Sequence, residues 1–239
     1  MEKKYAFTTL LATDDYLYGV LGLFTSLNIV NSKYPLHVMV TDNICQSTLN
    51  ILKENNISYT IFKREDFCYD EESQKGYALT LNKLHIFNLL EYDKVCFIDA
   101  DALVKNNIDD VFLYETPRFF IHNPPDFLSG ILFCVTPEKN TFAHIVEKFQ
   151  YKCANDEMVL NRFYNYESCI ANNSFFENSI IHKSDFGQFD DKYWKYFGLN
   201  SLDKIQTFIK SEFKNDYQQC EQYFLELEQK FNFNFNPII

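Results

Sequence analysis

The 239-residue sequence predicts an α/β protein with a mostly parallel central sheet and flanking helices. Short runs rich in β-branched and apolar residues alternate with longer segments of helical spacing, which is the pattern of strand–helix–strand units. Hydrophobic residues make up 46% of the chain and charged residues only 23%, so a sizeable core can form. We expect residues 1–239 to form one domain, because neither a repeat nor a clear linker interrupts the pattern.

The first quarter of the chain supplies three predicted strands and two predicted helices in alternation. Each strand is short and apolar, as buried strands of a parallel sheet are, and each helix carries apolar residues three or four positions apart. In chain order we expect a strand over 5–13, a helix over 16–30, a strand over 36–41, a helix over 45–55 and a strand over 58–62.

The remaining elements include one helix whose Leu81, Leu84, Phe87 and Leu90 lie on roughly one side. In chain order we expect this helix over 80–90, strands over 94–98, 118–122 and 130–135, helices over 140–151 and 156–164, and a strand over 179–182. A C-terminal helical extension is expected over about 202–239, where its apolar side packs on the body of the fold, with binding of a partner as the alternative. Its last residues, 231–239, alternate and form either an added edge strand or a loose tail.

Composition and the lack of certain segments exclude several kinds of partner and location. The formal net charge of −11 and the lack of any basic run argue against nucleic acid. No segment approaches the ~18 uninterrupted apolar residues of a membrane span, and the N-terminus lacks the apolar stretch of a signal peptide. The cysteines are scattered, and Cys96 and Cys134 lie in apolar runs as reduced thiols do. We therefore expect a cytoplasmic protein, one that needs a bound cation to accept a phosphorylated substrate.

Asp99 and Asp101 directly follow the apolar strand KVCFI. Ligands of open α/β sheets bind outside the carboxyl ends of the strands, and residues two apart in extended chain point to the same side. Carboxylates suit Mg²⁺ or Mn²⁺, and an added imidazole favours Mn²⁺. Acid-x-acid pairs are common in a chain with 33 acidic residues, so the position after the strand, more than the motif, predicts a metal site.

A series of segments, which follow one another in the family's order, resembles the glycogenin-like members of glycosyltransferase family 8. FIDADALV, preceded by LNKLHIF and followed by NNIDDVF, resembles the centre of that family, and LLATDDYLYGVLGLFTSL resembles its opening strand and helix. DFLSGILFCVTP resembles its acceptor-side segment, and NDEMVLN resembles its Ala-Asp-Gln-x-x-Leu-Asn motif. The resemblance runs from about Tyr5 to about Trp194. It implies a nucleotide-sugar-transferase domain of the GT-A type.

The resemblance also implies a binding site for a UDP-sugar donor. The positions that match the family's contacts to nucleotide, phosphates and sugar are Leu11, Thr13, Asp14, Tyr16, Lys83, Ala100, Ser129, Gly130, Glu157, Gly187 and Lys192. Lys183 is an alternative to the last two, because the segment after His182 departs from the family pattern. Tyr16 could instead pack on the first helix, and Lys83 could be a surface lysine.

Other positions match the family's metal ligands and catalytic residues. The resemblance implies that Asp99, Asp101 and His182 hold Mn²⁺, with Mg²⁺ as an alternative. Asp156 matches the aspartate regarded as nucleophile or stabiliser in these retaining enzymes, and Lys83 matches a family lysine that is placed toward the donor phosphates and sugar. The competing interpretation of Asp156 is a helix N-terminal aspartate that complements the helix dipole.

The resulting hypothesis is Mn²⁺-dependent, retaining transfer of a hexose, glucose from UDP-glucose, to a separate glycan, glycoprotein or small-molecule acceptor. Leu128 replaces a family asparagine, which removes one expected sugar contact, and Glu157 replaces a glutamine, which adds a charge. Residues 169–179 contain no tyrosine, so self-glucosylation is not expected. A homodimer is compatible with the aromatic surplus of Phe 25 and Tyr 16.

Two other classes of protein share parts of this pattern. Haloacid-dehalogenase-like phosphatases carry Asp-x-Asp after an apolar strand, but near the N-terminus and usually with Thr or Val where this chain has Leu103. A nucleotide-sugar-binding module without turnover would keep the fold and tolerate Leu128. Phosphate release from simple esters would indicate the phosphatase, and donor binding without UDP release would indicate the binding module.

Overall fold

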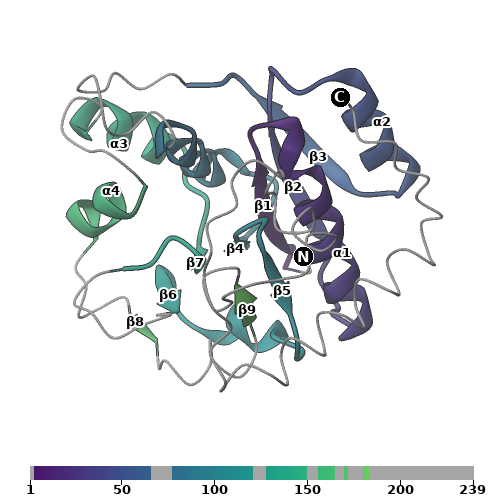
Figure 1. The fold of residues 1–239 in the computed structure, drawn as a ribbon. Coiled ribbons are helices and arrows are strands. Elements are labelled where there is room, and N and C mark those ends of the chain that lie inside the picture. The colour runs from purple at the N-terminus through teal and green to yellow at the C-terminus, as the bar shows by residue number, and fades with distance from the viewer. Residues whose placement is uncertain are drawn as a thin grey trace, which may run out of the picture.

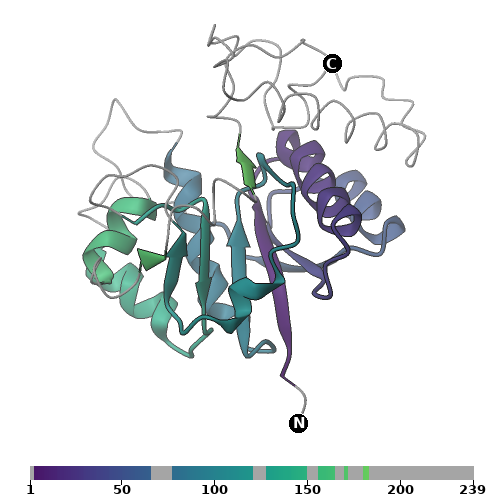
Figure 2. The ribbon, with the colours of Figure 1, turned by 90° about the horizontal axis from the view of Figure 1, so that it is seen from below.

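The computed structural model describes residues 3–65, 77–120, 128–149, 156–164, 170–171 and 180–182. These residues form three layers, in which a central sheet is covered by α1 and α2 on one face and by η2, α3 and α4 on the other (Figure 1, Figure 2). Figure 2 shows the sheet edge-on between the two helical layers. The predicted α/β class is thereby confirmed.

The central sheet has seven strands in the order β3-β2-β1-β4-β7-β6-β8. Strands β3, β2, β1 and β4 run parallel, β7 runs antiparallel to β4 and β6, and β8 is parallel to β6. The strands are β1 Tyr5–Leu11, β2 Leu36–Thr41, β3 Ser58–Phe62, β4 Lys94–Ile98, β6 Arg118–Phe120, β7 Leu132–Val135 and β8 Ile170–Ala171. A separate antiparallel pair joins β5 Ala102–Val104 to β9 Ile180–His182.

The α-helices lie within the predicted segments, whereas the short 3-10 helices η1 and η3 were not predicted, and two of the helix ends have local causes. Asn31 and Asn56 adopt left-handed backbone with φ of 53° and 55°, directly after α1 and α2. Asparagine tolerates this conformation, which turns the chain out of a helix. The helices are η1 Asp14–Tyr16, α1 Leu17–Ile29, α2 Gln46–Glu54, η2 Tyr77–Asn88, η3 Asp109–Leu113, α3 Thr141–Phe149 and α4 Asp156–Phe163.

The segment expected as a helix over 80–90 is a 3-10 helix, η2, over Tyr77–Asn88. Three residues per turn align Leu81, Leu84 and Phe87 on one side, and all three are buried. Leu90 was expected on that side, but it lies beyond the end of η2 and is 53% exposed. The expected C-terminal bound was therefore wrong, because the repeat of three residues ends with the helix.

The apolar core divides between the two faces of the sheet. Phe7 belongs to the cluster under α1 and α2, and its neighbour Ala6 belongs to the cluster under η2, α3 and α4, as alternation along a strand requires. Cys96 and Cys134 are buried, free and opposite each other on β4 and β7. No helix among the described residues has both the length and the apolar character needed to cross a membrane. The expected extension over 202–239 lies outside the described residues.

Candidate active site

A buried lysine joins two carboxylates at the carboxyl end of β4. Lys83 Nζ lies 2.7 Å from Asp99 Oδ1 and 3.0 Å from Asp156 Oδ2. Lys83 also donates a hydrogen bond to Gly130 O at 3.3 Å. Since Lys83 is only 8% exposed, its interpretation as a surface lysine is wrong. Four segments distant in sequence (η2, the end of β4, the approach to β7 and the start of α4) converge on this ammonium.

The electrostatic balance keeps Lys83 charged. Burial by itself lowers the pKa of Lys83, but the negative charges of Asp156 and Asp99, with their hydrogen bonds, outweigh burial and hold this pKa above its ordinary value. Lys83 is therefore a fixed positive charge and not a proton acceptor at neutral pH. Such a charge can compensate two buried carboxylates or a phosphate.

Gly130 stands where the chain leaves no room for a side chain. A Cβ on this residue would overlap Asp156 Oδ2 and lie 3.3 Å from Asp156 Cγ. The Gly130 N–H donates to Glu157 Oε1 at 3.1 Å, and the hydroxyl of buried Ser129 accepts a bond from Ile131 N at 3.3 Å. Glycine is required here by close approach.

The acidic pair Asp99 and Asp101 follows β4, and Asp101 is 7% exposed. Ala102, the next residue, pairs with His182 across the β5–β9 ladder, so the backbone of His182 runs beside the acidic pair. The side chain of His182 lies outside the described residues. Among the side chains that are described, no three of His, Cys, Asp and Glu form a metal-ion cluster. Carboxylates and an imidazole are nonetheless the types of ligand that fit Mn²⁺.

The positions matched to the nucleotide lie at the end of β1. Leu11 is the last residue of β1 and fully buried, so only its backbone can contact a ligand. Asp14 opens η1 and accepts hydrogen bonds from Cys45 N at 3.2 Å and Cys45 Sγ at 3.1 Å. Burial raises the pKa of Asp14, but hydrogen bonds from Thr48 and Cys45 outweigh it and lower the pKa. Thr13 precedes η1, and the ring of Tyr16 packs against the apolar cluster under α1.

The profile described as "Glycosyl transferase family 8" matches residues 7–173. The chain belongs to glycosyltransferase family 8. Among its relatives are galactinol synthase 6 of Arabidopsis thaliana, 32% identical over 56% of this chain and 40% of the relative, and glycogenin-1 of Oryctolagus cuniculus, 31% identical over 67% of this chain and 50% of the relative. The chain thus matches half or less of the length of these relatives.

Solved family structures support the fold. The galactosyltransferase LgtC, in complex with donor and acceptor sugar analogs, superposes with a TM-score of 0.60 at 14% identity, covering 98% of both chains. The glycosyltransferase GlyE of Streptococcus pneumoniae TIGR4 gives a TM-score of 0.60 at 13% identity, covering 97% of this chain and 64% of GlyE. The predicted family and the GT-A fold are confirmed, and family membership excludes the phosphatase interpretation.

Two residues of this family 8 site were missed from the sequence. The hydroxyl of Thr80 accepts a bond from Asp156 N at 3.4 Å, and Thr80 precedes Lys83 by one 3-10 turn. Asn161, the last residue of NDEMVLN, accepts from Leu128 N at 2.6 Å and donates to Leu128 O at 2.9 Å. Leu128 is itself fully buried in the core, so its side chain does not face a sugar.

Three further positions were matched to donor contacts in the sequence: one is buried, and two lie outside the described residues. Ala100, between the two aspartates, is buried. Gly187 and Lys192 lie outside the described residues, as does the alternative Lys183.

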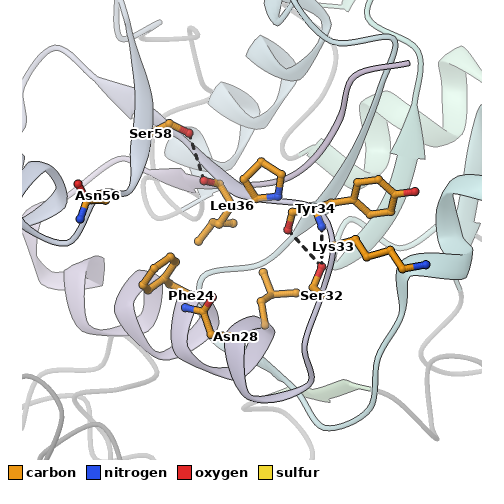
Figure 3. A pocket seen from close by; sticks show the side chains of 10 residues that line it. Phe24, Asn28, Ser32, Lys33, Tyr34, Leu36, Asn56 and Ser58 are labelled. Atoms are coloured by element: carbon orange, nitrogen blue, oxygen red, sulfur yellow. Dashed lines mark hydrogen bonds between the residues drawn. The ribbon is translucent and has the colours of Figure 1, made fainter. Parts of the chain in front are cut away.

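A pocket of about 390 Å³ lies at the opposite end of the sheet (Figure 3). It is lined by Phe24 and Asn28 of α1, by the segment from Ser32 to Leu36, and by Asn56 and Ser58. Leu36 and Ser58 begin β2 and β3, whereas Asp99 follows the end of the parallel β4. This pocket is therefore separate from the acidic cluster.

Proposed function

We propose that this family 8 protein catalyses retaining transfer of a hexose, glucose from UDP-glucose, to a separate acceptor. The observation that carries the proposal is the buried Lys83 ammonium held between Asp99 and Asp156 beside the Asp99–Asp101 pair. An ammonium there neutralises carboxylates that would otherwise repel a diphosphate. Donor ligands of α/β sheets bind at this end of the strands.

Asp99, Asp101 and His182 are proposed to hold Mn²⁺. Asp99, Asp101 and Asp156 bring three carboxylates to one end of the sheet, and carboxylate oxygens are ligands that Mn²⁺ and Mg²⁺ accept. When bound, Mn²⁺ supplies Lewis-acid stabilisation of the departing nucleoside diphosphate. The chain's own groups position the substrate around it.

Asp156 is proposed to act at the anomeric carbon. Its carboxylate is fixed by Lys83, its N–H is held by Thr80, and Gly130 leaves space for it. A carboxylate fixed in this way can stabilise an oxocarbenium-like centre or form a covalent glycosyl intermediate. Asp156 does begin α4, as the helix-dipole interpretation requires, but its pairing with Lys83 adds a second role.

The substrate contacts are proposed from the positions that match the family. Leu11, Thr13, Asp14 and Tyr16 are proposed to contact the nucleoside. The acceptor is proposed to be a glycan, glycoprotein or small molecule. Cys45, Cys96 and Cys134 are free, which supports our proposal of a cytoplasmic location. A single domain over 1–239 and a homodimer stay predictions.

The test is UDP release from a panel of UDP-sugars with Mn²⁺, with and without EDTA. Many transferases slowly hydrolyse their donor, so no acceptor is required. Release from UDP-glucose that EDTA abolishes is expected. Donor binding without release under any condition would favour the binding-module alternative, and release from another UDP-sugar alone would overturn the choice of glucose.

A further inference from the structure

The 3-10 helix η2 presents three distinct sides, because residues three apart align at three residues per turn. Leu81, Leu84 and Phe87 form the side buried in the core. Thr80 and Lys83 form a second side, and both contact Asp156. The third side begins at Leu79 and continues with the polar residues Asn82, His85 and Asn88.

The polar side of η2 is fastened to the segment that follows β3. Asn82 Oδ1 accepts from Glu65 N at 2.9 Å, and Asn82 Nδ2 donates to Glu65 O at 3.3 Å. Two residues earlier in that segment, Lys63 O lies 3.1 Å from His85 Nε2. Asn82 is fully buried and His85 is 4% exposed, so water cannot readily replace these bonds.

The His85 ring is held on both faces as well as at both nitrogens. It stacks on Phe62 at 4.6 Å and on Phe142 at 4.4 Å between ring centroids, with interplanar angles of 9° and 18°. Because Nε2 faces a carbonyl, it carries the hydrogen, and Nδ1 then accepts from Asn88 Nδ2 at 3.3 Å. His85 thus ties η2 to β3 and to α3.

The winding of η2 decides where Lys83 points. Successive side chains are about 120° apart on a 3-10 helix, so Thr80 and Lys83 coincide in direction. On an α-helix, at about 100° per residue, their directions would differ by about 60°, so the 3-10 winding brings the two side chains into closer alignment toward Asp156. Long 3-10 helices are uncommon because their hydrogen bonds are poorly aligned, so η2 needs support from outside.

We propose that Asn82 and His85 are positioning residues for Lys83. By fastening η2 to the backbone of Lys63 and Glu65, they hold its 3-10 winding and keep the ammonium between Asp99 and Asp156. The inference rests on the proposed function for the catalytic role of Lys83. It adds to the reaction two buried side chains that are directed away from the acidic cluster.

The test compares Asn82→Ala and His85→Ala with His37→Ala. His37 is a matched control because it is also a buried histidine (5% exposed) with bonds from both ring nitrogens, to Ser58 and Thr60, but it lies at the start of β2. UDP release gives kcat and KM for the folded fraction, and acetic anhydride labelling with mass spectrometry reports exposure of Lys83. We expect the η2 variants to lose about 10- to 100-fold in kcat, as small misplacements do, and to label Lys83 several-fold faster. The control should change neither.

Conservative variants sharpen the test. His85→Gln keeps an N–H donor for Lys63 O, so it should recover most of the lost kcat and protection. Asn82→Asp instead sets a buried carboxylate oxygen against the carbonyls of Glu65 and Leu79, so it should recover neither. The inference would be overturned if Lys83 in Asn82→Ala and His85→Ala were labelled at the wild-type rate. It would also be overturned if these variants lost no more kcat than His37→Ala. Labelling of Lys83 does not depend on turnover. If the wild-type protein released no UDP, the proposed function would be rejected, and the labelling rates would still show whether Asn82 and His85 position Lys83.

Discussion

Replacing Lys83 by Met should affect both stability and turnover. The substitution keeps most of the side-chain volume but leaves Asp156, whose side chain is 5% exposed, and Asp99, at 18%, without their shared cation. Removing one partner of a buried ion pair destabilises a protein by about 3–5 kcal/mol. The partial exposure of Asp99 allows water to offset some of this loss, so we expect a decrease of about 3 kcal/mol in the free energy of unfolding.

Urea unfolding followed by circular dichroism measures that loss, and UDP release measures turnover of the folded fraction. Lys94→Met is the matched control, because Lys94 lies at the other end of β4, where its Nζ donates to the carbonyls of Phe112 and Tyr114 at 2.8 and 2.6 Å and lies over the Tyr5 ring. We expect Lys83→Met to lose at least about 100-fold in kcat and Lys94→Met to keep it. A Lys83→Met protein with wild-type stability and turnover within twofold would refute the assigned role of this ammonium.

Three further predictions concern the surroundings of Lys83. Gly130→Ala places a Cβ against Asp156 Oδ2 and should lower the free energy of unfolding by about 1–3 kcal/mol. Because Asp156 must move to make room, UDP release should fall about 100-fold. Turnover within twofold of wild type would contradict the need for glycine at this position. Asn161→Ala leaves Leu128 N and O without these partners and should lower the free energy of unfolding by about 2 kcal/mol in urea titrations, an expectation that an unchanged midpoint would contradict. Burial lowers the pKa of His85 to about 4 in the folded protein, against about 6.5 in the unfolded chain. The neutral histidine therefore contributes about 3 kcal/mol to the free energy of unfolding above pH 6.5, and this contribution is lost as the pH falls toward 4. His85→Phe keeps an aromatic ring between Phe62 and Phe142 but has no titrating group. The free energy of unfolding of this variant should therefore fall less than that of wild type between pH 6.5 and 4. An equal fall in both proteins would argue against a buried neutral histidine.

The parallel strands could be predicted closely because each is a short apolar run between turns. The observed β2, β3 and β4 have the expected bounds of 36–41, 58–62 and 94–98. Residues 102–104 and 170–171 were missed, because runs of two or three residues carry no readable alternation. Their pairing partners are set by tertiary contacts that no local pattern encodes.

The candidate site was only partly accessible from sequence. The motif order predicted Asp99, Asp156 and Lys83 as separate contributors, but the ion pairs that join them depend on the winding of η2. The repeat of three in Leu81, Leu84 and Phe87 was the available signal for that winding, and it was interpreted as an ordinary helix. Thr80 was missed because its contact with Asp156 joins residues far apart in the sequence, which no local pattern shows.

The most direct test of the proposed metal site is UDP release by Asp101→Asn. The wild-type protein with UDP-glucose and Mn²⁺ sets the reference rate, EDTA sets the background, and circular dichroism checks the fold. Asparagine keeps the size of the side chain but removes the charge that a divalent cation requires. The account predicts a native spectrum with UDP release at the EDTA background. Full Mn²⁺-dependent release by a correctly folded Asp101→Asn protein would contradict it.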